Sequence, residues 1–104
     1  MAANVSCGDF AISEPVLNSK TSRACIWNGG TINVTAGGGF SGYISVQIVG
    51  ADGKEYFNKG TTNGCPANIG SVYLPAQKYE VYISSGNGGG SCNIFPYPVA
   101  ILSG

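Results

Sequence analysis

The chain of 104 residues contains no histidine, and this absence bears directly on the classes of function that are open to it. Histidine is the commonest general base, and both Ser-His-Asp and Cys-His nucleophilic sites require it. A glycosidase needs two converging carboxylates. Among the five acidic residues, Asp52 is explained by a turn, and Glu55 and Glu80 have outward strand parity. We therefore predict that the protein is not an enzyme.

Charge is also scarce, because charged residues make up 10% of the chain and the formal net charge is zero. The five basic residues are scattered, so no patch is available to neutralise nucleic-acid phosphates. No basic amphipathic run or transmembrane span indicates a membrane contact. The D-x-D-x-D-G calcium loop, the P-loop and the dinucleotide-binding fingerprint are all missing. We expect no nucleic-acid partner, no membrane and no cofactor.

Helical periodicity is missing from every stretch of ten or more residues, and short alternating runs take its place. The clearest alternation lies in Tyr43 to Phe57, where Ile44, Val46 and Ile48 are separated by polar residues. This period of two is typical of a half-buried strand. Residues 50–53, Gly-Ala-Asp-Gly, suit a tight reversal. The segment predicts a β-hairpin around which the other strands are arranged.

Other short apolar runs predict further strands, separated by turn-forming residues. They are Phe10 to Ile12, Val16-Leu17, Ala24 to Trp27, Thr31 to Thr35, Ser71 to Leu74, Tyr79 to Ser84, the extended Ile94 to Pro98 and Val99 to Leu102. Loops are expected at Asn18 to Ser22 and Asn58 to Asn68, and residues 1–6 are expected to form a flexible N-terminal arm. Such a pattern favours an antiparallel sandwich or small barrel. The sequence predicts one all-β domain over residues 1–104, a small antiparallel β-sandwich of six to eight short strands.

Four cysteines are widely spaced along the chain: Cys7, Cys25, Cys65 and Cys92. An even number in a small, loop-rich chain indicates two disulfides and an oxidising compartment, with three pairings open. Free buried thiols are the alternative. A four-thiolate zinc site would need close pairs such as C-x-x-C, so no metal is expected. We predict a secreted protein that has lost its leader, with Met1-Ala2-Ala3 placed before the mature N-terminus; export without a leader is the alternative.

The six tyrosines cannot all fit in one small core, so some of them are expected at the surface. Tyrosine on a rigid sheet offers a large contact area with little entropy to lose. Ordinary cross-strand pairing of tyrosines and core packing of Trp27 are the alternatives. The candidate binding residues, on edge strands or an aromatic face, are Tyr43, Ser45, Gln47, Tyr79, Tyr82 and Trp27.

Two asparagines, Asn4 and Asn33, match the acceptor pattern for N-glycosylation. Asn33 would need an exposed position, and its parity opposite Ile32 and Val34 predicts one.

The order of cysteines and glycines carries one further piece of information. Cys7 stands just before a first strand, and Cys25 is followed closely by Gly29-Gly30 and a strand. Cys65 closes a strand and a loop of Thr, Asn and Gly, and Cys92 follows two more strands and a glycine-rich segment. This layout resembles the ToxB-like branch of the MAX effectors, small secreted proteins of plant-pathogenic fungi. The resemblance spans about residues 5 to 92, and the strand at Tyr43 to Val49 and the tail after Cys92 depart from it.

The resemblance implies a six-stranded β-sandwich with the disulfides Cys7–Cys65 and Cys25–Cys92. It also implies a non-enzymatic virulence factor that binds host plant proteins. Some members of that family pair an edge strand with a host sheet, for which Tyr43 to Val49 and Tyr79 to Ser84 are the first candidates here.

Two other functions stay open on the sequence. One is a self-assembling extracellular or spore-surface fibre subunit, joined through the N-terminal arm with Cys7 bonded to a neighbouring subunit. The other is a small carbohydrate-binding lectin that uses exposed tyrosines and Trp27. The expected partner is a host or extracellular protein, and a monomer is expected unless fibres form.

Overall fold

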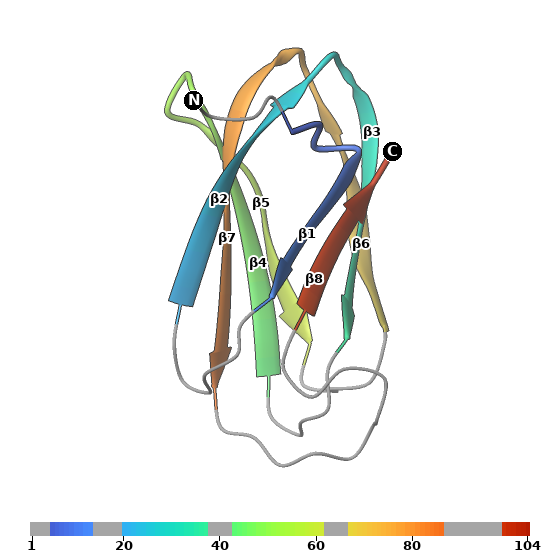
Figure 1. The fold of residues 1–104 in the computed structure, drawn as a ribbon, viewed down its shortest axis with the longest axis vertical. Helices are drawn as coiled ribbons and strands as arrows, with labels where there is room; N and C mark the ends of the chain where they lie inside the picture. The colour runs from blue at the N-terminus through green and yellow to red at the C-terminus, as the bar shows by residue number, and fades with distance from the viewer. Residues whose placement is uncertain (1–4, 14–19, 38–42, 62–66, 87–98) are drawn as a thin grey trace.

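The computed structural model describes residues 5–13, 20–37, 43–61, 67–86 and 99–104, which form eight strands and no helix (Figure 1). The predicted all-β class is confirmed for these residues. The strands are β1 (Asp9–Ser13), β2 (Lys20–Trp27), β3 (Gly30–Gly37), β4 (Tyr43–Gly50), β5 (Glu55–Thr61), β6 (Ala67–Leu74), β7 (Gln77–Gly86) and β8 (Val99–Ser103).

The strands form two four-stranded antiparallel sheets that face each other (Figure 1). Sheet A has the order β2-β7-β4-β5, and sheet B has the order β1-β8-β3-β6. The chain changes sheet at every connection except the β4–β5 hairpin. This strand order is that of a jelly roll, in which eight strands fold as two Greek keys. The sandwich is thus confirmed, with eight strands rather than the six that the resemblance implies.

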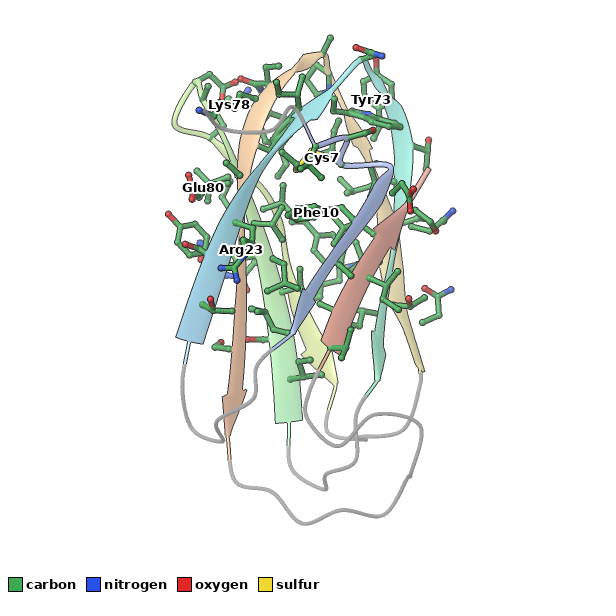
Figure 2. All side chains as sticks on the ribbon, viewed as in Figure 1. Cys7, Phe10, Arg23, Tyr73, Lys78 and Glu80 are labelled. Atoms are coloured by element: carbon green, nitrogen blue, oxygen red, sulfur yellow. A yellow bond between two sulfur atoms is a disulfide. The ribbon has the colours of Figure 1, made fainter. Side chains whose placement is uncertain are left out.

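The core consists of the alternate side chains that the two sheets turn toward each other. Ile44, Val46 and Ile48 of β4 are completely buried, as the alternation predicted. Figure 2 shows Phe10 of β1 lying between the sheets, and its side chain is buried. Fully burying one such side chain stabilises the fold by about 1.5–3 kcal/mol. The hairpin turn between β4 and β5 is also confirmed, and Gly53 within it adopts a φ of 85°.

Three strands extend into segments that the sequence predicted to be loops, because polar residues join the sheets through backbone pairing. Lys20 pairs with Ser84, so β2 begins inside the expected loop Asn18 to Ser22. Both β5, which ends at Thr61, and β6, which begins at Ala67, enter the expected loop Asn58 to Asn68. The loop predictions are wrong at these positions. Val16-Leu17 and Ile94 to Pro98 lie outside the described residues.

Part of the N-terminal arm is held against sheet A rather than flexible. The Ile26 amide donates to the Val5 carbonyl at 2.8 Å, and the Cys7 amide donates to the Ile26 carbonyl at 3.0 Å. Ser6 therefore forms a parallel bridge with Ile26 of β2. The prediction of a flexible arm is therefore wrong for residues 5 and 6. Residues 1–4 lie outside the described part of the chain.

This pairing determines the disulfide, which joins Cys7 to Cys25. The arm brings their Cα atoms to 5.0 Å, within the range that a disulfide requires. The implied pairs Cys7–Cys65 and Cys25–Cys92 are therefore wrong, and the resemblance to the MAX effectors loses its main support. Cys65 and Cys92 lie outside the described residues, so one bridge of the expected two is shown.

Candidate binding face on sheet A

Three of the candidate binding residues meet on the outer surface of sheet A. Gln47 of β4 is the direct cross-strand partner of Tyr82 of β7. Ser45 pairs with Ser84, two residues further along each strand. Their side chains are half-buried, whereas the intervening residues of both strands are buried in the core. We call this surface the sheet A face; it comprises Ser45, Gln47, Val49, Glu55, Asn58, Glu80, Tyr82 and Ser84.

Polar side chains on the sheet A face are held by hydrogen bonds to each other. The hydroxyls of Ser45 and Ser84 lie 2.7 Å apart. Glu55 Oε2 accepts from Gln47 Nε2 at 2.9 Å and from Asn58 Nδ2 at 2.8 Å. Side chains that are already positioned lose less entropy when a partner binds. Tyr82 therefore lies among polar side chains whose positions are already fixed by hydrogen bonds.

A shallow hollow of about 240 Å³ lies at the turn end of this face. Figure 2 shows Lys78 and Glu80 on the outer side of sheet A, where they help to line it. The remaining lining comes from Val49, Gly50, Ala51 and Tyr79. Pockets for drug-sized ligands usually span about 300–1,000 Å³. The hollow is thus below that range, and its size and mixed charge suit a single side chain of a larger partner.

Beside the hollow, the β4–β5 and β6–β7 turns are joined by a hydrogen-bonded group that we call the turn network, made of Asp52, Tyr56, Gln77 and Tyr79. Tyr56 Oη donates to Asp52 Oδ2 at 2.6 Å. Gln77 Nε2 donates to Tyr56 Oη at 3.2 Å and to Tyr79 Oη at 3.3 Å, and Gln77 Oε1 accepts from the Asp52 amide at 3.2 Å. Tyr79 Oη donates to the Pro75 carbonyl. The network holds the edge of the hollow in place.

Ionisation of the turn network is shifted by the same contacts. The Tyr56 hydroxyl, with the Lys54 amide, holds the pKa of Asp52 below its usual value. The Asp52 carboxylate in turn raises the pKa of Tyr56. Burial raises the pKa of Tyr79. Asp52 is therefore ionised and both tyrosines are neutral near neutral pH.

Two of the aromatic candidates are held mainly by packing. Tyr79 is 1% exposed and packs edge-on against Tyr56, so it is a core residue that reaches the surface only where it lines the hollow, and its assignment as an exposed binding residue is wrong. Tyr79 has the same strand parity as Val81 and Ile83, which are buried. Trp27 is half-buried and donates from Nε1 to the Gly30 carbonyl at 3.2 Å, which supports the packing alternative. The side chain of Tyr43 lies outside what the structure describes.

The expected edge pairing through β4 or β7 is also wrong. β7 lies between β2 and β4, and β4 lies between β7 and β5, so both strands are paired on both sides. The sequence could not reveal this, because strand order depends on contacts between distant segments. The edge strands are β2 and β5 in sheet A and β1 and β6 in sheet B.

The outer surface of sheet B contains two residues of interest. Asn33 is exposed there, as its parity predicted, whereas Asn4 lies outside the described residues. Tyr73 is 63% exposed, and the sequence did not single it out. Its parity opposite Leu74, which is buried, was the signal that could have found it. Figure 2 shows Tyr73 on the sheet B side, away from Lys78 and Glu80.

The described residues hold no group of three or more histidine, cysteine, aspartate or glutamate side chains that could bind a metal ion. Within the same part of the chain, no helix is long and apolar enough to cross a membrane. No protein-family model matches the chain, and no curated protein matches it.

Proposed function

We propose that the protein is a secreted, non-enzymatic binding protein that recognises a protein partner through the sheet A face. The observation that carries the proposal is the position of Tyr82 among side chains that are already hydrogen-bonded, next to a hollow. Tyrosine is enriched among the residues that dominate binding energies, and a surround that excludes water strengthens its contribution. The disulfide Cys7–Cys25 is consistent with an extracellular location.

The chemistry of the face favours a protein over a small molecule. The hollow is small, and its neighbours Lys78 and Glu80 carry opposite charges. Opposite charges on one face give specificity for a partner with the reverse pattern rather than for a highly charged polymer. A partner that places one side chain in the hollow and packs against Tyr82 would use both features.

The test is affinity capture from extracellular fluid of the source organism and of its hosts, comparing Tyr82→Ala with Tyr73→Ala. Tyr73 is the matched control, because it is an exposed tyrosine on the opposite sheet. We expect the captured partner's affinity to fall about tenfold or more with Tyr82→Ala, as for a residue that contributes over 1 kcal/mol. Equal retention by both variants would contradict the proposal.

The more specific role, a fungal effector that binds a host plant protein, depends on the resemblance and not on the face. Infiltration of the purified protein into leaves of many host genotypes tests it, with cell death or chlorosis as the supporting result. A clean absence of response would count against it, while leaving the binding test of Tyr82 to decide the broader proposal.

The described residues give little support to the two alternative functions, a fibre subunit and a lectin. A fibre joined through Cys7 requires that cysteine to reach a neighbour, but Cys7 is buried and bonded to Cys25 of its own chain. A lectin would use Trp27, which is occupied in packing and in its bond to Gly30. Both therefore rank below the binding protein.

A further inference from the structure

The two sheets differ in how their outer surfaces are made polar. Within the described strands, sheet B contains Asp9 as its only charged residue. The strands of sheet A contain Lys20, Arg23, Glu55, Lys59, Lys78 and Glu80. Surface charge is one of the usual means by which proteins stay soluble. The outer surface of sheet B therefore depends on uncharged polar groups, which include hydroxyls and one amide.

That amide belongs to Asn33, which lies on β3 between the neighbouring strands β8 and β6. Its direct cross-strand partners are Ser103 of β8 and Ser71 of β6, and all three residues are exposed. Because serine is small, neither partner covers the Asn33 side chain. With Val34 and Thr35, Asn33 forms the Asn-X-Thr acceptor pattern for N-glycosylation. The fold thus leaves room for a bulky group on the Asn33 nitrogen.

An exposed aromatic ring lies beside Asn33 on the same surface. Tyr73 of β6 pairs with Thr31 of β3, so it is the diagonal neighbour of Asn33. Diagonal neighbours in antiparallel sheets are about 7–8 Å apart, within reach of an aromatic side chain. The Tyr73 side chain is 63% exposed, and Figure 2 shows it beside β3. The face of an aromatic ring carries partial negative charge, which attracts polarised C–H groups such as those on one face of a sugar.

We propose that Asn33 is an N-glycosylation site and that the first sugar of its glycan packs on the ring of Tyr73. The inference rests on the secretion that forms part of the proposed function, with which the disulfide Cys7–Cys25 is consistent. A glycan is bulky and solubilising, so it would add polarity to the sheet that has little charge. It would also leave the sheet A face free, because Asn33 lies on the outer surface of the other sheet.

The transfer step uses an oligosaccharide carried on a lipid diphosphate. The Asn33 side-chain nitrogen bonds to the anomeric carbon of the first sugar and loses one proton. The bond from that carbon to the diphosphate oxygen breaks, and the lipid diphosphate leaves with the electron pair. In the folded protein β3 is paired on both sides, and the Thr35 hydroxyl donates to the Ile101 carbonyl at 3.4 Å. The acceptor segment is therefore modified before sheet B forms.

The first test is peptide mass spectrometry of the full chain recovered from extracellular fluid of the source organism. We expect the peptide that contains Asn33 to carry a glycan, and enzymatic release of that glycan to leave aspartate at position 33. In secreting eukaryotic cells, Asn33→Gln should lose the glycan, whereas Thr35→Ser, which preserves the acceptor pattern, should retain it. A bare Asn33 in the secreted protein would overturn the inference and leave the Tyr82 binding test unaffected. Protein found only inside cells, with Asn33 bare, would reject secretion as well.

The second test asks whether the glycan contacts Tyr73. Protons that lie over the face of an aromatic ring are shifted upfield in NMR spectra. We expect this shift for protons of the first sugar in the glycosylated protein, its loss in Tyr73→Ala and its retention in Tyr82→Ala. Tyr82 is the matched control, because it is a tyrosine on the outer surface of the other sheet. First-sugar protons that resonate as they do in a short glycopeptide would refute the packing on Tyr73.

Discussion

The two sides of the sandwich are closed by different chemistry. On the β1/β2 side, a covalent bond between Cys7 and Cys25 ties the segment before β1 to sheet A. On the β5/β6 side, the described residues close the gap by packing, with Phe57 of β5 against Gly70 of β6. The turn network adds hydrogen bonds near the start of β5. Among the described residues, the sandwich is thus tied covalently on the β1/β2 side, whereas the ring of Phe57 fills the gap between β5 and β6.

The β1/β2 side also depends on one aromatic side chain. A Cβ atom on Gly8 would lie 2.5 Å from Trp27 Cζ3, and one on Gly104 would lie 2.6 Å from Trp27 Cη2. The ring of Trp27 therefore fills the space that these glycines leave open. Disulfide and indole together hold the chain as it passes from the arm into β1.

The largest difference between the two sides should follow from removing the disulfide. The double variant Cys7→Ala, Cys25→Ala should lose about 3 kcal/mol of unfolding free energy, because the bridge closes a loop with a sequence separation of 18. Urea unfolding measures the loss. Hydrogen exchange should show the amides of Cys7 and Ile26 exposed first, with β5 and β6 little changed. A loss below about 1 kcal/mol would show that the covalent tie is not what closes this side.

A smaller difference is expected from one added methyl group on each side. Gly8→Ala should destabilise the protein by about 1–3 kcal/mol, because the new Cβ meets the indole of Trp27 and the core must shift. Gly70→Ala is the matched control, since its Cβ would lie 3.4 Å from Phe57 Cε1, close to ordinary contact. We expect a change within about 1 kcal/mol there, offset by reduced unfolded-state entropy. Thermal unfolding compares the two, and equal losses would contradict the contrast.

The smallest effect concerns pH on the β5/β6 side. The pKa of Asp52 is lowered in the folded protein, so the stability that its hydrogen bond with Tyr56 contributes is present above the unfolded value of about 4. It should be lost as the pH falls through the lower folded pKa. Asp52→Asn should flatten this acid limb in the urea midpoint. If the acid limb is unchanged in Asp52→Asn, the loss of stability at low pH does not come from Asp52.

Much of each strand could be predicted because a buried face leaves a period-two pattern. The alternation around Ile44, Val46 and Ile48 gave β4 and its hairpin. Strand order was not accessible, because it depends on pairing between segments as distant as β1 and β8. For the same reason β4 and β7 were expected at edges and are central.

The disulfide shows the same division between local pattern and long-range pairing. The even number of cysteines indicated bridges, but no local property of Cys7 selects Cys25 over Cys65. Cys25 is selected as the partner of Cys7 by the parallel bridge between Ser6 and Ile26, which no pattern of residues in the sequence predicts. The sheet A face was likewise found in part: Ser45, Gln47 and Tyr82 were singled out, whereas Glu55 and Asn58 join them only through the register of β5.

The measurement that tests the account most directly is disulfide mapping of the native protein by mass spectrometry after proteolysis without reduction. The account predicts a peptide pair that joins Cys7 to Cys25. A pair that joins Cys7 to Cys65, together with Cys25 to Cys92, would contradict the closure of the β1/β2 side and restore the support for the MAX resemblance.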